Sequence, residues 1–186
     1  ILAKIQDGFV PLVAAIPGMA LYVAVANPET RALFSIGVFA DEARAAESSR
    51  VAGDWVKTNI PDVFEGDPEV HNGVIGVATP ASASDLLGKY VVIRLRQPNP
   101  EWKVEEVMRL IGEGYVPLVE KIPGFIAYFG SADAKTGGQA YITMFDDKAG
   151  TEESTRVAGE WLKANNYTFF TGDPTLAEGE IGAAVQ

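Results

Sequence analysis

The chain has 186 residues, no cysteine and a formal net charge of −10 at pH 7. The lack of cysteine excludes disulfides and thiolate chemistry and is compatible with the cytoplasmic location that we expect. The acidic charge argues against nucleic acid as the main partner, because phosphate binding needs a concentrated basic face. No apolar run reaches the ~18 residues of a membrane span, so no span is expected.

The first half of the chain predicts the order α-β-β-α-β. Residue spacing and turn signals set the bounds of these elements. In chain order, they are a helix at 1–15, strands at 19–25 and 32–39, a helix at 42–59 and a strand at 73–78.

The second half predicts the order β-α-β-β-α-β. Its strands are expected at 89–95, 125–131, 139–145 and 179–185, and its helices at 101–120 and 149–165. The prolines of QPNP (97–100) should end the first strand, and Pro117 should kink its helix or tighten the last turns. Asp146 or Asp147 should cap the second helix, and the GDP sequence (172–174) should form a turn before a short final strand.

The two halves repeat the same sequence pattern. GFVPLVAAIPG at 8–18 returns as GYVPLVEKIPG at 114–124, and ESSRVAGDWVKTN at 47–59 returns as ESTRVAGEWLKAN, in each case 106 positions later. This period is far longer than the ~20–50 residues of a solenoid repeat. We therefore expect two domains, residues 1–80 and 81–186, each with its own core.

The first copy lacks the opening strand that the second copy has. The repeat predicts that strand about 12–18 residues ahead of Ile1. A sheet without it would expose apolar surface and unpaired backbone groups. We therefore expect the natural protein to begin before this residue.

The strands of the first copy do not alternate between apolar and polar residues. The segments 21–25 and 33–39 are apolar or small almost throughout. A sheet with one face in water should alternate, so both faces of this sheet need cover. Helices can cover one face, and the sheet of the second copy is the expected cover for the other.

This element order, the GFVPLV and PG motif and the FADEARAAESSRVAGDWV segment resemble the dimeric α/β-barrel superfamily, in particular antibiotic-biosynthesis-monooxygenase-like (ABM) domains. The resemblance covers nearly the whole chain twice. It implies an α+β fold in which two ferredoxin-like β-α-β-β-α-β repeats pack sheet to sheet as an intrachain dimeric α/β barrel.

The resemblance implies two kinds of chemistry. Haem-degrading relatives need a histidine on the iron, and this chain has only His71, whose counterpart in the second copy is Ala177. A lone loop histidine is more typical of a surface residue, so we expect neither a metal nor another cofactor. Cofactor-independent monooxygenases are the better comparison. They oxidise electron-rich polycyclic substrates with sites built from Trp, Asn, Tyr and Arg.

Side chains of these types give the candidate ligand-binding residues, while the catalytic residues stay unassigned. The candidates are Tyr22, Tyr128, Trp55, Trp161, Asn59 and Asn165. Each has a structural alternative. The tryptophans suit a helix core and the asparagines suit helix C-terminal caps. The pairs Arg50 with Asp54 and Arg156 with Glu160 suit exposed ion pairs.

Two functions stay open, and whether the chain is an enzyme stays open with them. The first is binding or oxidation of a small apolar, aromatic molecule in the barrel cavity. The second is a non-catalytic binding or structural subunit, as a homo-oligomer or in a larger assembly. The copies differ at strand positions, Phe34 against Ala140, Ser35 against Tyr141 and Leu21 against Ala127. We therefore predict at most one functional pocket.

Overall fold

The computed structural model describes residues 1–64, 66 and 68–186. The chain forms two compact units. Unit 1 contains Ile1–Val70, Ser84–Gly88 and Glu180–Gln186, and unit 2 contains His71–Ala83 and Lys89–Gly179.

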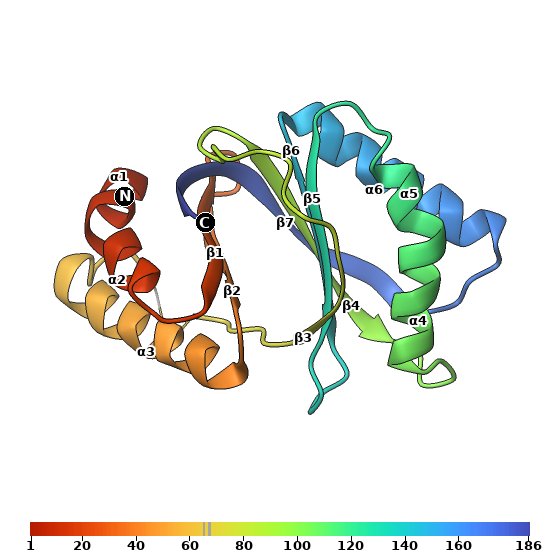
Figure 1. Cartoon of the computed structure of the whole chain (residues 1–186), viewed down its shortest axis with the longest axis horizontal. Coiled ribbons are helices and arrows are strands. Elements are labelled where there is room, and N and C mark those ends of the chain that lie inside the picture. The colour runs from red at the N-terminus through yellow and green to blue at the C-terminus, as the bar shows by residue number, and fades with distance from the viewer. Residues whose placement is uncertain (65, 67) are drawn as a thin grey trace. The chain divides into compact units, whose positions relative to one another are not determined.

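Unit 1 packs helical segments on one face of a small antiparallel sheet (Figure 1). Its elements are α1 (Leu2–Lys4), η1 (Ile5–Phe9), α2 (Val10–Ala14), β1 (Met19–Asn27), β2 (Ala32–Phe39), α3 (Glu42–Asn59) and the last residues of β7 (Phe170–Val185). The strand order is β2-β1-β7. The buried core between helices and sheet is formed by Ile5, Phe9, Val10, Val13, Ile16, Tyr22, Ala24 and Ala183.

Unit 2 has the same construction with a larger sheet. Its elements are β3 (Val74–Ala78), β4 (Tyr90–Pro98), α4 (Val104–Leu110), η2 (Ile111–Tyr115), α5 (Val116–Val119), β5 (Phe125–Ala132), β6 (Gln139–Phe145), α6 (Lys148–Ala164) and the first part of β7. The strand order is β7-β4-β6-β5-β3. Helices α4, α5 and α6 lie on one side of β5 and β6 (Figure 1).

The compact units exchange terminal strands between the two sequence copies. β3, from the first copy, pairs antiparallel with β5, with Val77 opposite Gly130. The end of β7, from the second copy, pairs antiparallel with β1, with Val25 opposite Ile181. Each sheet is therefore completed by a strand of the other copy.

Most element bounds agree with the sequence prediction. β2 and α3 have the predicted bounds, and the side chain of Asp147 accepts a hydrogen bond of 3.0 Å from the Gly150 N–H as the cap of α6. β4 ends at Pro98, so the prolines of QPNP end this strand as predicted, a few residues beyond the expected bound. The prediction for the end of the chain was wrong, because the GDP sequence lies inside β7 and not in a turn before a short strand. Gly172 has a φ of +68°, so its freedom of conformation lets the chain bend there while β7 continues.

Both N-terminal helical segments contain a π-helical turn at the same place. The Val116 N–H bonds to the Ile111 carbonyl and the Val10 N–H to the Ile5 carbonyl, five residues back in each case. Pro117 was expected to kink the helix or tighten its last turns, and the turn after it is tightened: the Lys121 and Ile122 N–H groups bond three residues back, to the Leu118 and Val119 carbonyls. The widened turn before Pro117 was not predicted. π-Helical turns are frequent at functional sites.

Candidate functional site

Three aromatic side chains form a row between the sheet and the helices of unit 1. Tyr22 extends from β1, Phe9 from η1 and Trp55 from α3. The ring centroids of Tyr22 and Phe9 are 5.3 Å apart, and those of Phe9 and Trp55 are 5.8 Å apart. These edge and tilted geometries are favourable for aromatic pairs. Two predicted site residues, Tyr22 and Trp55, therefore both pack against Phe9.

Unit 2 repeats this row at the equivalent positions. Tyr115 lies 5.7 Å from Tyr128 and 5.8 Å from Trp161 between ring centroids. The Tyr115 hydroxyl donates a hydrogen bond of 3.0 Å to the Ser154 carbonyl, which satisfies a buried polar group. Tyr128 and Trp161 are therefore joined in the same way as their counterparts.

A glycine in each π-helical turn lies directly against the indole ring. A Cβ atom added at Gly8 would be 3.1 Å from Cζ2 of Trp55, and one added at Gly114 would be 2.9 Å from Cζ2 of Trp161. The absence of a side chain thus allows the turn to approach the ring. These glycines were not predicted as site residues, although their place in the repeated GFVPLV and GYVPLV motifs was a signal.

The two indole rings differ in what covers them. Trp161 is 9% exposed, with Tyr167 at 5.1 Å and Phe169 at 6.0 Å between ring centroids. In the first copy, 106 positions earlier, these two residues are replaced by Pro61 and Val63, both of which are exposed. Trp55 is only half-buried as a result.

A pocket of about 380 Å³ lies at the less covered ring. It is lined by Ala3, Lys4, Asp7, Gly8, Trp55 and Asn59. This volume is within the usual range for small-ligand sites. Trp55 offers an apolar ring, whereas Lys4 and Asp7 offer charges of opposite sign. The pocket therefore suits an aromatic molecule that carries polar substituents.

The two predicted asparagines bond to the carbonyl of the tryptophan one turn earlier. Asn59 Nδ2 donates to the Trp55 carbonyl at 2.9 Å, and Asn165 Nδ2 donates to the Trp161 carbonyl at 2.8 Å. Both asparagines therefore make contacts expected of helix C-terminal caps, the structural alternative given for them above. In unit 1, the same bond also fixes the Asn59 side chain at the pocket.

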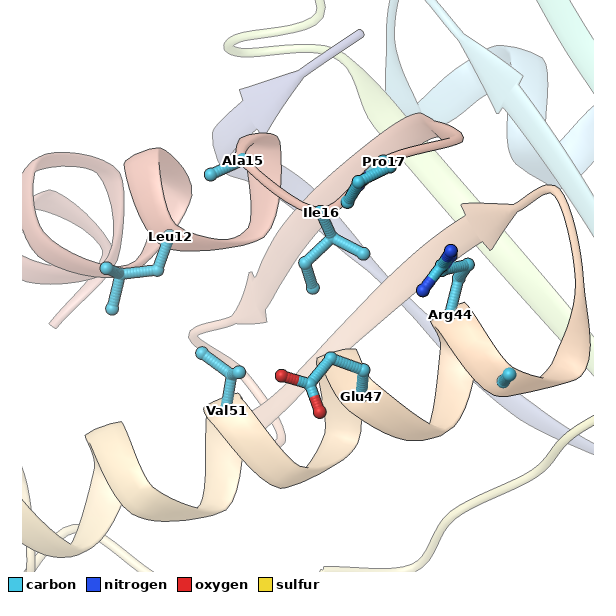
Figure 2. A pocket seen from close by; sticks show the side chains of 8 residues that line it. Leu12, Ala15, Ile16, Pro17, Arg44, Glu47 and Val51 are labelled. Atoms are coloured by element: carbon cyan, nitrogen blue, oxygen red, sulfur yellow. The ribbon is translucent and has the colours of Figure 1, made fainter.

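A second hollow of about 510 Å³ lies between the end of α2 and the first half of α3. Arg44, Glu47 and Val51 of α3 face residues from the other side across it, as Figure 2 shows. The residues on that other side are Leu12, Ala15, Ile16 and Pro17, and Ala43 completes the lining. Leu12 is 45% exposed there.

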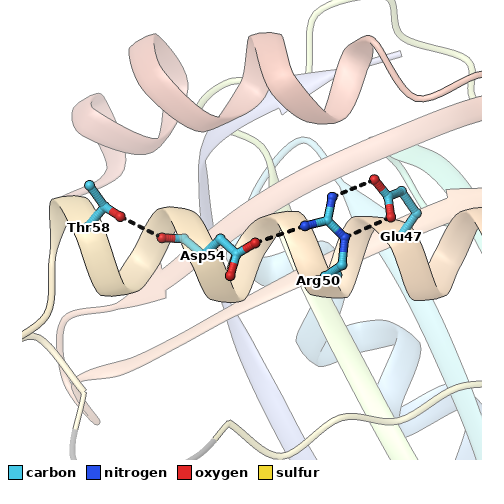
Figure 3. Close-up of polar contacts among 4 residues, drawn as sticks. All are labelled: Glu47, Arg50, Asp54 and Thr58. Carbon is cyan, nitrogen blue, oxygen red and sulfur yellow. Dashed lines mark hydrogen bonds and ion pairs between the residues drawn. The ribbon is translucent and has the colours of Figure 1, made fainter.

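The predicted ion pairs of α3 lie on its surface. Arg50 contacts Glu47 at 2.8 Å and Asp54 at 2.9 Å, and Thr58 Oγ1 donates to the Asp54 carbonyl at 2.9 Å (Figure 3). The hydrogen bond from Arg50 lowers the pKa of Glu47. Arg50 is therefore engaged in an exposed ion-pair network, as the structural alternative predicts. Arg156 makes the equivalent contact with Glu160 at 2.5 Å.

Burial raises the pKa of both strand tyrosines above that of an exposed tyrosine. It raises the pKa of Tyr22 to about 12, although a hydrogen bond with Ser35 lowers it in part. It also raises the pKa of Tyr128 well above 10. Both hydroxyls are neutral near pH 7, so they can donate hydrogen bonds but are poor general bases.

One buried cation, Arg94 of β4, was not predicted from the sequence. Its guanidinium donates to Thr143 Oγ1 at 3.1 Å, Ser154 Oγ at 2.7 Å and Thr155 Oγ1 at 2.6 Å. Only 4% of the residue is exposed, and burial lowers the pKa of Arg94. The signal was an arginine within the apolar strand sequence KYVVIRL, but its three hydroxyl partners lie on other elements.

The part of the chain that the structure describes contains neither a cluster of metal ligands nor a membrane-spanning helix. No group of three or more His, Cys, Asp or Glu side chains within residues 1–64, 66 and 68–186 could hold a metal ion. Nor does any helix in those ranges combine the length and apolar character needed to cross a bilayer. His71, which was considered above as a haem ligand, lies in unit 2.

Solved structures with the same fold match nearly the whole chain. A candidate monooxygenase from Fusobacterium nucleatum subsp. nucleatum superposes with a TM-score of 0.75 at 12% identity, covering 98% of this chain and 85% of the other. An anthrone oxidase-like protein has a TM-score of 0.63 at 14% identity, with coverages of 99% and 86%. A Listeria monocytogenes ferredoxin-fold protein related to antibiotic biosynthesis monooxygenases has a TM-score of 0.55 at 10% identity, with coverages of 95% and 88%.

This chain has the ABM-like ferredoxin fold. The fold class expected from the resemblance is therefore confirmed, and the similarity includes both copies. No protein-family model and no curated protein sequence matches the chain. At these identities the similarity concerns the fold and leaves the reaction open.

Proposed function

We propose that the chain binds a small aromatic molecule in the pocket beside Trp55 of unit 1. One observation carries the proposal: this indole ring lines a pocket of about 380 Å³, whereas Tyr167 and Phe169 cover the equivalent ring of unit 2. The sequence led us to expect a ligand inside the barrel. The pocket on which the proposal rests is within one unit instead.

The lining defines the chemistry of the ligand. A planar ring can stack on Trp55 or meet it edge to face, which contributes about 0.5–1.5 kcal/mol beyond area burial. Lys4 and Asp7 can bond to hydroxyl or carbonyl groups on the ligand. A phenol or a polycyclic ketone with free hydroxyl groups satisfies both requirements.

Oxidation of the bound ligand by O₂ is the finer form of the proposal. The anthrone oxidase-like neighbour supports an aromatic substrate by analogy of fold. In such a reaction a ring CH₂ group and O₂ give a ring C=O group and water, so the atoms and electrons balance without a co-reductant. Tyr22 is buried and does not line this pocket, so the proposal gives it no contact with the ligand.

Tryptophan fluorescence tests the binding proposal. Anthrone or 1-naphthol should quench the emission saturably in the wild-type chain. Trp55→Phe should lose this quenching and weaken binding by about tenfold or more. Trp161→Phe is the matched control and should keep both the affinity and the quenching. Equal effects of the two substitutions would refute the proposed position of the ligand.

Oxygen consumption separates the enzyme from the binding module. With anthrone as the substrate, turnover that is lost in Trp55→Phe and kept in Trp161→Phe would support oxidation at this pocket. Saturable binding without oxygen uptake would instead support the non-catalytic alternative. That alternative is supported by the pocket lining, which contains neither of the strand tyrosines.

A further inference from the structure

β2 is an edge strand whose sequence lacks the charges and prolines that usually protect such an edge. In the part of the chain that the structure describes, it is the end strand of the order β2-β1-β7 and pairs with β1. Its sequence ALFSIGVF contains neither a charged residue nor a proline over eight residues. Protein edges are normally protected by charges, prolines or bulges. An unprotected edge of this kind is a site for strand addition.

In unit 2 the strand equivalent to β2 is β6, and a further strand pairs with its edge. β6 has β4 on the corresponding side, with Val92 opposite Thr143 and Arg94 opposite Tyr141. The helix-facing side chains of β6 are then at most 5% exposed. Their counterparts in β2 are exposed at Ser35 and Gly37 and half-buried at Leu33 and Phe39.

Unit 1 also retains two of the three hydroxyls that would receive an arginine, while the third, Thr143 in unit 2, is replaced by Gly37. In unit 2 the Arg94 guanidinium bonds to the hydroxyls of Ser154 and Thr155 on α6. The equivalent residues on α3, 106 positions earlier, are Ser48 and Ser49, and Ser48 is buried at 8% exposure. Two hydroxyls thus occupy the positions where an added strand would place its arginine.

We propose that the edge of β2 binds an extended peptide strand with the residue pattern of β4. The strand adds antiparallel, places its arginine opposite Ser35 and directs the guanidinium to Ser48 and Ser49. Its apolar residues cover the helix-facing side of β2, and its backbone pairs with the free N–H and C=O groups.

A synthetic peptide tests this surface. A fluorescently labelled KYVVIRLRQ peptide, the sequence of residues 89–97, should bind the chain saturably. Hydrogen–deuterium exchange should then show protection of the backbone amides of 32–39. A peptide with Leu at the arginine position that matches Arg94 should bind about tenfold more weakly, and a scrambled peptide should give no protection.

A variant of the chain tests the arginine contact separately. The double substitution Ser48→Ala and Ser49→Ala should remove the preference for the arginine peptide over the leucine peptide. Alanine is the stronger helix former, so α3 should remain folded, and urea unfolding checks this. Equal binding of the scrambled peptide would overturn the proposal. So would protection at β3 instead of β2, or a dimer that protects 32–39 without peptide.

Discussion

Gly8 and Gly114 offer a matched comparison at the scale of single residues. Gly114→Ala places a Cβ atom 2.9 Å from a buried indole, so the core must shift, at a cost of about 1–3 kcal/mol. Gly8→Ala meets the half-buried Trp55 at 3.1 Å, and this ring is freer to move. A gain of up to about 1 kcal/mol in helix propensity offsets the cost at both sites.

We therefore expect Gly114→Ala to lower the free energy of unfolding and Gly8→Ala to leave it within about 0.5 kcal/mol of wild type. Urea denaturation of the two variants checks this. If the two substitutions cost the same, the inferred difference in ring cover between the units is wrong.

Tyr22 predicts a loss of stability at alkaline pH. Its folded-state pKa of about 12 lies above the ordinary tyrosine value of 10.0. The unfolded chain therefore releases the proton first, and the free energy of unfolding falls as pH rises from about 10 to 12. The full difference for this one group is about 3 kcal/mol. Below pH 10 the group makes no pH-dependent contribution.

Tyr22→Phe should flatten this fall in part. The other buried tyrosines, Tyr115, Tyr128 and Tyr141, also have raised pKa values and keep a slope in both proteins. Urea unfolding at several pH values from 9 to 12 gives the comparison. Identical slopes in the variant and the wild type would contradict the burial of the Tyr22 hydroxyl.

The sequence predicts local contacts better than their surroundings. Helical spacing predicts the Arg50 and Asp54 pair because both partners lie on one turn of one helix. The different cover of Trp55 and Trp161 could also have been found, since Tyr167 replaces a proline in the repeat. The hydroxyl partners of Arg94 could not, because they lie on elements 49 to 61 positions away.

At the scale of the element, α3 and α6 begin with equivalent caps. Asp41 accepts a hydrogen bond of 2.9 Å from the Arg44 N–H, and Asp147 accepts one of 3.0 Å from the Gly150 N–H. Asp41→Ala and Asp147→Ala should each lower the free energy of unfolding by about 1 kcal/mol. Asn in place of either aspartate should restore most of this. Thermal unfolding that is unchanged in both alanine variants would rule out a capping role.

The elements that the sequence predicted poorly are held by strand pairing between residues far apart in the chain. Gly172 and Pro174 are typical turn residues, yet β7 runs through them from Phe170 to Val185. The two parts of this strand belong to different compact units, and the second part pairs with β1 at the other end of the sequence. Local propensity carries no information about such a partner.

At the scale of the whole molecule, the duplication yields two units of one construction with unequal interiors. The row of strand tyrosine, helix aromatic and tryptophan is kept in both. Tyr167 and Phe169 stack at 4.4 Å beside it in unit 2. The prediction of at most one functional pocket stays a prediction. We expect one aromatic ligand per chain in calorimetric titration, and a stoichiometry of two would contradict this.

The chemical shifts of the indole N–H groups test the central claim most directly. The chain has three tryptophans, Trp55, Trp102 and Trp161, so a ¹⁵N-labelled sample gives three such signals, and Trp55→Phe assigns the first. On addition of 1-naphthol or anthrone, the Trp55 signal should move saturably while the Trp161 signal stays in place. A shift of the Trp161 signal with an unchanged Trp55 signal would contradict the proposed site.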